Sequence, residues 1–377
     1  MLELIAAILY SFTTAISIFF VYKLSIAFRK FRIKKLISGP SMLSNMPSVS
    51  VCIPARNETH AMTECLERVI ASTYPKLEII VLDDSSIDNT SHLIKAFAHS
   101  GVRFVEGTKL PVGWLGKNHA LQELLSEASG TLVLFMDVDT HIQPDTIEQL
   151  VSYIRQQRVS MISALPMRED GLRPSIIFST LRFFWEIILR HRSRPAVAST
   201  AWMIDRNVLI DEFGGFQFIK KSIQPEGVLA SRLSKSKRYR FLIGTKLLGI
   251  SYEKKWSSQI DTSIRLLYPA FGGRIAYGIF AFIFLLLLNM PTVIVINGLL
   301  TEWTITHIVA FWQMCIFIAI YAHYLGAIWK HGWWLAALLW PYVIAQELVV
   351  LIISIYRYMR GTITWKGRPV TTSLRAK

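Results

Sequence analysis

Hydrophobic residues follow two patterns along this chain: long uncharged stretches near both ends, and short apolar runs in the middle. The stretch from Leu4 to Tyr22 contains no charged residue. A helix rises about 1.5 Å per residue, so this stretch covers the roughly 30 Å hydrocarbon core of a bilayer. It starts after Glu3, and basic residues follow it from Lys23 to Lys35. This predicts a retained anchor with a cytosolic basic flank rather than a cleaved signal peptide.

Three further hydrophobic segments lie near the C-terminus, at Ile275 to Thr301, Trp303 to Trp329 and Gly332 to Tyr356. The first two are uncharged, and the third contains one charged residue, Glu347. Three full crossings after a cytosolic domain would export the basic tail 357–377, against the usual preference of basic segments for the cytosol. We expect a cytosolic tail and a last segment that is re-entrant or interfacial, where a carboxylate is tolerated. The alternative is a tail outside the cell.

The middle of the chain has the composition of a globular domain. Four short apolar runs alternate with segments of helical period: Val49 to Ile53, Leu77 to Leu82, Val102 to Val105 and Leu132 to Met136. Such runs are typical of buried parallel strands, and their alternation with helices predicts a doubly wound α/β sheet. The expected organisation is an anchor at 1–28, a basic linker at 29–46, a cytosolic catalytic domain at 47–262, a membrane region at 263–356 and a basic tail at 357–377.

Composition narrows the class of protein. Of 377 residues 52% are hydrophobic and 18% charged, with a formal net charge of +15, so a disordered or acidic protein is excluded. The basic residues flank hydrophobic segments, and the sequence has no nucleic-acid-binding module. We therefore expect contact with a membrane and not with nucleic acid. The three cysteines have no metal-ligand spacing, and we expect a reducing compartment.

Polar residues follow the first predicted strand in the run Pro54-Ala55-Arg56-Asn57-Glu58. In open α/β sheets, ligands bind beyond the carboxyl ends of the strands, so these residues are candidates for a binding site. The alternative is a turn followed by an acidic helix cap.

A second polar cluster, Asp83 to Thr90, follows the second strand. Its carboxylates, Asp83 and Asp84, could accept hydrogen bonds from ribose hydroxyls or a base N–H group. Ser86 and Asp88 also suit helix capping, so we expect part of the cluster to be structural.

A third cluster, Asp137-Val138-Asp139, follows the strand that begins at Leu132. On an extended chain, carboxylates at positions i and i+2 point the same way and could hold one hard divalent cation. A bound cation would let a diphosphate approach. The alternative is an ordinary surface turn, but the two preceding strand-end clusters favour a functional site.

Together these clusters resemble glycosyltransferase family 2, whose inverting enzymes have the Rossmann-like, nucleotide-sugar-binding GT-A fold. The resemblance covers Val49 to about Ser263. It is sharpened by Gly113-Trp114-Leu115-Gly116-Lys117 and by Trp365-Lys366-Gly367-Arg368, which look like stretches of membrane-bound bacterial members that glycosylate carotenoid-type and other polyprenoid lipids. The fold class expected is therefore an α/β GT-A domain plus transmembrane helices.

The resemblance implies a role for each matching residue. Asp139 and Asp137 would bind Mg²⁺ or Mn²⁺, and Lys117 would approach the diphosphate of a UDP-sugar. For Lys117 the alternative is a solvated lysine at a helix start, and for Trp114 it is burial as a core aromatic. The residues implied in substrate binding are Pro54, Ala55, Arg56, Glu58, Asp83, Asp84, Trp114, Lys117, Asp137, Trp365 and Arg368.

An inverting transfer also needs a general base for the acceptor hydroxyl. In the family, this base belongs to an Glu-Asp pair downstream of a Gly-Gly-Phe turn. Here Gly214-Gly215-Phe216 is followed by a single acid, Glu226, which is the candidate base. The alternative is that Glu226 is an acidic residue at a helix N-terminus, where the helix dipole stabilises its negative charge.

The family's Q-x-x-R-W motif, found in processive synthases, has only Gln259 as a counterpart here. The resemblance therefore implies transfer of one sugar, taken to be glucose, from a UDP-sugar to a membrane lipid such as a carotenoid, another polyprenoid or a glycerolipid. Two alternatives remain: a processive polysaccharide synthase, and a non-catalytic membrane scaffold with a decayed transferase fold.

The apolar stretch from Ser175 to Pro195 has basic edges, with Arg182, Arg190 and Arg194 among its residues. This pattern suits an interfacial segment whose arginines meet anionic headgroups. A buried helix of the catalytic domain is the equally weighted alternative.

Overall fold

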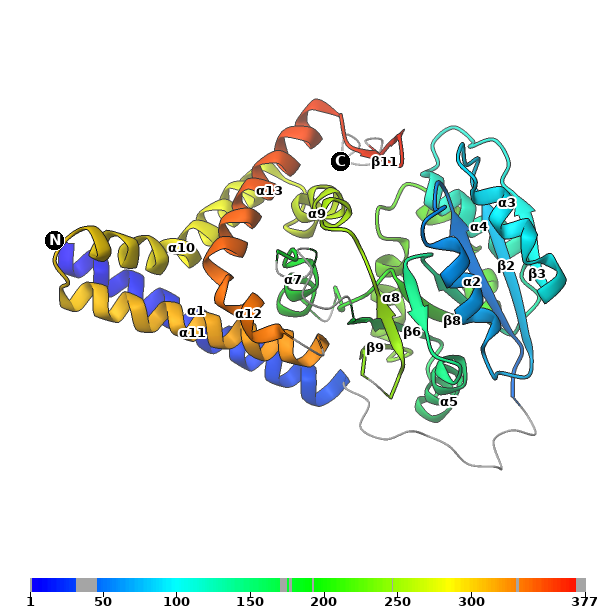
Figure 1. Cartoon of the computed structure of the whole chain (residues 1–377), viewed down its shortest axis with the longest axis horizontal. Coiled ribbons are helices and arrows are strands. Elements are labelled where there is room, and N and C mark those ends of the chain that lie inside the picture. The colour runs from blue at the N-terminus through cyan, green and yellow to red at the C-terminus, as the bar shows by residue number, and fades with distance from the viewer. Residues whose placement is uncertain are drawn as a thin grey trace. The chain divides into compact units, whose positions relative to one another are not determined.

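The computed structural model describes residues 2–31, 46–169, 175, 178–191, 193–245, 247–329 and 332–370. The chain folds into two compact units (Figure 1). The helical unit comprises Met1–Lys30, Arg168–Ile188 and Lys254–Ile363, and the α/β unit comprises Phe31–Met167, Leu189–Glu253 and Thr364–Lys377. The continuous catalytic domain expected at 47–262 is thus interrupted by residues 168–188, and the end of the chain returns to the α/β unit.

A seven-stranded sheet forms the centre of the α/β unit, with strand order β3-β2-β1-β4-β8-β6-β9. Its strands are β1 (Val49–Ala55), β2 (Leu77–Asp83), β3 (Val102–Glu106), β4 (Leu132–Met136), β6 (Met161–Leu165), β8 (Ala201–Asp205) and β9 (Tyr239–Ile243). Strand β8 runs antiparallel to both of its neighbours, and the other pairings are parallel. The predicted α/β class is confirmed, and the antiparallel strand makes the sheet mixed.

The four predicted strands are all present. Strands β1, β2 and β3 extend one or two residues beyond the predicted ends because those residues still pair in register, with Ala55 opposite Asp83 and Asp83 opposite Glu106. All five residues of β4 are buried, as expected for a central strand covered on both faces.

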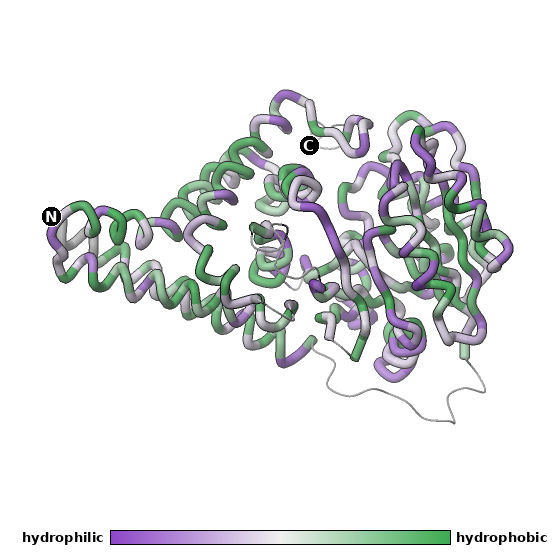
Figure 2. Tube along the Cα trace, in the orientation of Figure 1, coloured by the Kyte–Doolittle hydropathy of each residue, from purple (hydrophilic) through white to green (hydrophobic). Residues whose placement is uncertain are grey.

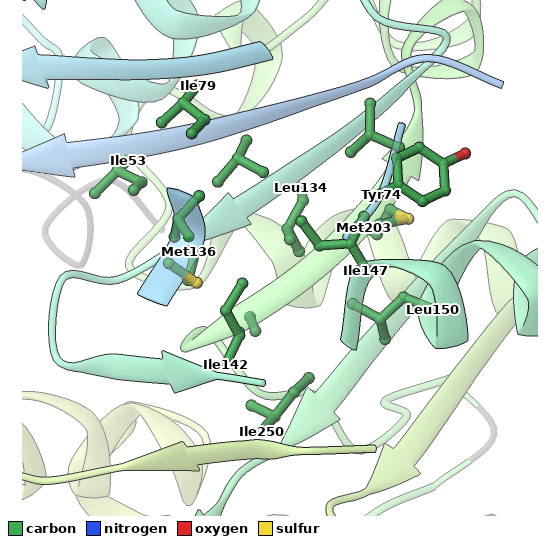
Figure 3. Packing of buried hydrophobic residues seen from close by; sticks show 14 of the residues in the cluster. Ile53, Tyr74, Ile79, Leu134, Met136, Ile142, Ile147, Leu150, Met203 and Ile250 are labelled. Carbon is green, nitrogen blue, oxygen red and sulfur yellow. The ribbon is translucent and has the colours of Figure 1, made fainter. Parts of the chain in front are cut away.

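Helices flank the sheet and bury its apolar side chains (Figure 3). Ile53, Leu134 and Met203 of the sheet belong to one cluster with Ile147 and Leu150 of a flanking helix. The helices are α2 (Met62–Ile70), α3 (Thr90–Ala96), α4 (Gly116–Glu127), α5 (Thr146–Gln157) and α8 (Pro225–Lys235). Short elements complete the unit: η2 (Ala98–Ser100), η3 (Val208–Glu212), η4 (Gln217–Ile219), β5 (Thr140–Ile142) paired with β10 (Ile250–Tyr252), and the hairpin β11 (Thr364–Trp365) and β12 (Arg368–Pro369). The two-residue strand β7 (Met167–Arg168) lies where the chain passes between the units.

The helical unit contains the hydrophobic segments, which are largely green in Figure 2. Its helices are α1 (Leu2–Phe31, whose last residue lies past the unit's Lys30 limit), α7 (Arg182–Ile188), α9 (Trp256–Ala270), α10 (Ile275–Leu300), α11 (Ile305–Ile328), α12 (Trp333–Leu338) and α13 (Trp340–Arg360). Within the described chain, α1, α10, α11 and α13 are long and apolar enough to cross a membrane. The segment expected from Gly332 to Tyr356 is divided at Leu339, because Pro341 suits a first helical turn but not a helix interior.

Helix α7 is buried within the helical unit. The ring of Phe184 lies 5.4 Å from Phe20 of α1 and 5.3 Å from Tyr324 of α11, measured between centroids. Glu347 of α13 is fully buried and accepts hydrogen bonds from the Leu181 amide (2.9 Å) and from Trp185 Nε1 (3.0 Å). The stretch 182–188 is therefore a packed helix of this unit and not part of the α/β domain.

Gln259 of α9 also has a structural role. It accepts a hydrogen bond from Arg168 Nη1 (3.1 Å) and donates to the carbonyl oxygens of Ser175 (2.6 Å) and Lys254 (2.9 Å). This glutamine therefore holds neighbouring segments of the helical unit together.

Candidate active site

The strand order brings three of the predicted clusters to one edge of the sheet. Strands β2, β1 and β4 are neighbours and parallel, so their carboxyl ends lie side by side. Arg56 follows β1, Asp84 follows β2 and Asp137 follows β4. Three segments separated by tens of residues in the sequence thus supply polar side chains to one place.

Hydrogen bonds join the first two loops. The Asp84 amide donates to the Ala55 carbonyl (2.8 Å), and Arg56 Nη1 donates to the carbonyls of Asp84 and Ser85 (3.0 Å for Ser85). Asn57, in a left-handed conformation (φ 52°), receives the Ile87 amide on Oδ1 (2.9 Å). The loops therefore form one surface, with half-buried Pro54 at the end of β1.

Asp83 supports the second loop. It is 4% exposed, and its carboxylate accepts hydrogen bonds from the Ser86 amide (3.2 Å) and from the hydroxyls of Ser86 and Ser91. The oxygens of Asp83 therefore hold its own loop, whereas the carboxylate of Asp84 contacts Arg368 near the end of the chain.

Lys117 lies in the first turn of α4 and forms an ion pair with Asp137, with Nζ 2.5 Å from Oδ1. Asn118 fixes this turn by donating to three carbonyl oxygens, those of Ile219, Lys220 and Ser222. Half-buried Trp114 packs edge-on against His119, with 5.6 Å between ring centroids. The start of α4 thus presents an ammonium group to the carboxylates after β4.

Asp137 and Asp139 lie in a tight turn and not on the extended chain expected from the sequence. Val138 and Asp139 form the turn, with Val138 buried and the Thr140 amide donating to the Asp137 carbonyl (3.0 Å). Both aspartates lie close enough to Glu58 for their charges to affect its pKa. Burial raises the pKa of Glu58, Lys366 opposes the rise, and the charges of Asp139 and Asp137 add to it. Acidic groups therefore crowd this region and favour cations.

The C-terminal hairpin supplies two cations. Arg368 Nη1 donates to both carboxylate oxygens of Asp84 (2.8 and 2.7 Å), and Lys366 Nζ donates to Glu58 Oε1 (2.6 Å). Burial raises the pKa of Asp84, and the Arg368 guanidinium opposes that rise. Half-buried Trp365 precedes them in β11.

Gly116 explains part of its motif. A Cβ at this position would lie 2.9 Å from Arg368 Nη1 and 3.4 Å from Asp84 Oδ2. Glycine therefore leaves room for the Arg368–Asp84 pair at the start of α4.

Lys366 belongs to the Trp365-Lys366-Gly367-Arg368 stretch, but the resemblance implied no role in the site for it. A signal was present: the Lys-Gly pair between Trp365 and Arg368 is compatible with a two-residue hairpin turn. Such a turn would have placed Lys366 beside Arg368.

Glu226 comes from a different part of the unit. It is 1% exposed and lies in the first turn of α8, directly after Pro225. The preceding turn is held firmly: Gly215 has φ 71°, the Phe216 amide donates to Gln122 Oε1 (2.7 Å), and the Phe216 ring packs on Phe135 of β4 at 5.5 Å. Both the base and helix-acid roles are compatible with this position.

The acidic turn matches part of a divalent-cation site. Among the described residues, no group of three or more histidine, cysteine, aspartate or glutamate side chains is arranged to hold a metal. Mg²⁺ is commonly held by one or two carboxylates together with water and substrate phosphates. Asp137 and Asp139 fit that donor set when a diphosphate supplies further oxygens.

Comparison with known proteins agrees with this geometry. Residues 50–213 match the model of the family described as Glycosyl transferase family 2. An undecaprenyl-phosphate 4-deoxy-4-formamido-L-arabinose transferase from Pectobacterium carotovorum is 24% identical over 226 residues, covering 56% of this chain and 68% of the relative. A 4,4'-diaponeurosporenoate glycosyltransferase from Staphylococcus aureus is 29% identical over 124 residues, or 32% of each chain.

A solved structure shows the same fold over nearly the whole chain. The mannosyltransferase PcManGT from Pyrobaculum calidifontis, in complex with GDP-Man and Mn²⁺, superposes with a TM-score of 0.57 at 18% identity, covering 95% of this chain and 99% of the other. The sequence match and the mixed sheet agree with each other: residues 50–213 are similar to glycosyl transferase family 2, and the α/β unit that contains them has a GT-A-like fold.

Proposed function

We propose that this protein transfers a sugar, expected to be glucose, from a UDP-sugar to a lipid acceptor in the membrane, with inversion at the anomeric carbon. The observation that carries the proposal is the Lys117–Asp137 pair beside Asp139, at the sheet edge that also presents Asp84. This edge offers carboxylates that could bind the nucleobase of the donor and a cation, and it offers basic side chains for the diphosphate.

Each residue has a specific part in the proposed reaction. Asp84 would accept a hydrogen bond from the nucleobase of the UDP-sugar. Lys117 and Arg368 would turn from their carboxylate partners toward the diphosphate. Asp137 and Asp139 would hold Mg²⁺ or Mn²⁺, which when bound would neutralise charge on the leaving diphosphate. The donor pocket would be completed by five further residues: Pro54, Ala55, Arg56, Glu58 and Trp365. Two names among the relatives specify lipid-related acceptors, undecaprenyl phosphate and diaponeurosporenoate.

The proposed sugar transfer needs no reactant besides the UDP-sugar and the acceptor. The acceptor oxygen forms a bond to the anomeric carbon, the bond from that carbon to the diphosphate oxygen breaks, and UDP leaves. Glu226 would receive the proton of an acceptor hydroxyl on a carboxylate oxygen. A carboxylate acceptor is already ionised at neutral pH and would need no base.

The proposal is tested with purified protein in nanodiscs, supplied with UDP-glucose and lipid extract. We expect a glycosylated lipid by mass spectrometry in the presence of Mn²⁺ or Mg²⁺, and its loss when EDTA is added. Lipids from cells with and without the gene, fed labelled glucose, identify the acceptor. If the purified protein binds neither sugar nucleotides nor divalent ions, as expected of a non-catalytic scaffold, the proposal is contradicted.

A further inference from the structure

The C-terminal hairpin is built around a left-handed turn. Lys366 and Gly367, the two central residues, have φ values of 48° and 80°. Positive φ at both positions is the mark of a type I′ turn, which matches the twist of a two-residue hairpin. Glycine adopts this conformation readily, whereas a lysine there is strained because its Cβ crowds the backbone. A lysine at such a position is notable when its side chain has a defined partner.

Lys366 has several partners in the loop after β1. Its ammonium donates to Glu58 Oε1 (2.6 Å) and to the main-chain carbonyl of Arg56 (2.7 Å). In return, Arg56 Nε donates to the main-chain carbonyl of Lys366 (3.2 Å). The contact is thus reciprocal and includes the backbone of both segments, which lie 310 residues apart.

This arrangement differs from a surface ion pair. About a quarter of each side chain is exposed, 27% for Lys366 and 28% for Glu58, so solvent screens the pair less than it screens exposed ones. The loop that Lys366 holds contains Asn57 at positive φ and carries Arg56, which binds the carbonyls of Asp84 and Ser85. One ammonium group therefore steadies the junction of two strand-end loops.

We propose that Lys366 is a positioning residue of the donor site, and that the loop from Arg56 to Glu58 takes its binding conformation only when the C-terminal hairpin is docked on it. This inference rests on the proposed function for the identity of the donor, but the docking itself does not. It predicts that the C-terminal hairpin, far away in sequence, controls donor affinity rather than the chemical step.

The test is Lys366→Met in the full chain, which keeps most of the apolar stem of the side chain and removes the ammonium group. Arg360→Met is the matched control, because it removes one positive charge six residues earlier, from an exposed side chain of α13. For K366M we expect the KM for the UDP-sugar to rise about tenfold or more while kcat stays within about threefold. R360M should leave both constants unchanged.

Hydrogen exchange of donor-free protein gives a readout independent of activity. We expect K366M to exchange faster at residues 56–58 and at Asp84, with no change in β6. A K366M protein with wild-type KM and wild-type exchange overturns the inference. If wild-type protein neither binds nor uses a UDP-sugar, the proposed function fails, and the exchange result still decides whether Lys366 positions the loop.

A second variant covers the case in which K366M does not fold. Gly367→Ala keeps Lys366 but opposes the positive φ of the turn, and there is open space around this glycine. It should raise KM and local exchange in the same direction. An unchanged KM and exchange in G367A would count against hairpin docking as the cause.

Discussion

Single carboxylates in this site have different environments. Asp83 is bound by loop hydroxyls, Asp84 by Arg368, Asp137 by Lys117, and Glu226 lies buried at the start of α8. Burial and partner decide what each can do: a group already occupied by its own loop is structural, whereas a group held by a movable cation can exchange that partner for substrate.

At this scale the sharpest prediction concerns Glu226. Glu226→Gln should lower transfer to a hydroxyl acceptor by about a hundredfold or more, because the amide cannot accept the proton. UDP-sugar affinity, measured by calorimetry, should stay within about threefold of wild type. Glu148→Gln is the control, since Glu148 is also a first-turn helix acid and lies on α5, outside the site.

Turnover of the Glu226 variant close to wild type would remove this residue from the mechanism, provided that the acceptor carries a hydroxyl. If the product proves to be a sugar ester of a carboxylate lipid, a small effect is expected, because the acceptor is already deprotonated.

Among the secondary structure elements, α7 shows how a short helix is placed by one acidic residue. Seven residues form too short a helix to be stable alone, so α7 depends on tertiary contacts. The two oxygens of Glu347 each accept one hydrogen bond from α7 or the residue before it. The aromatic rings of Phe184 and Trp185 then pack around this contact.

Replacing Glu347 should therefore have a graded effect on stability. Glu347→Gln keeps an acceptor for one donor and should cost about 1–3 kcal/mol, and Glu347→Leu leaves two buried donors unpaired and should cost more. Thermal unfolding in detergent measures the order. Val349→Ala, at a side chain 56% exposed on the same helix, is the control. A Leu variant as stable as wild type would show that these hydrogen bonds contribute nothing net.

For the whole molecule, the hairpin constrains the path of the chain through a membrane. Lys366 contacts Glu58 and Arg368 contacts Asp84, so the hairpin and the loops after β1 and β2 must lie on the same side of any bilayer. Between Glu253 and Thr364 the chain must then cross an even number of times. Three helices there are candidates, and α13 has lower mean hydropathy than α10 and α11 and contains Glu347. We infer that α10 and α11 cross and that α13 does not.

Cysteine labelling tests this path. The cysteine of Ser373→Cys should resist an impermeant thiol reagent in intact cells, whereas that of Glu302→Cys, between α10 and α11, should react. Removing Cys315 first lowers the background, because Cys52 and Cys65 are buried. Labelling of both positions from outside would mean that α13 crosses and that the hairpin contacts do not form in cells.

Sequence patterns predicted much of the fold because the forces behind them are local. Uncharged stretches identified α1, α10 and α11, and Val- and Ile-rich runs identified four parallel strands. The strand-end clusters at Arg56, Asp84 and Asp137 could be expected at one edge because parallel strands share their direction. The antiparallel strand β8 and the break at Leu339 were not anticipated.

The sequence by itself therefore determined which segments are apolar enough to cross a membrane, where the four strands lie, and which polar groups follow them. Only the tertiary structure decided which groups become partners: Lys366 with Glu58, Arg368 with Asp84, and Glu347 with α7. The physical reason is sequence separation. A contact across 308 residues depends on how every intervening element packs, and no local propensity or period records it.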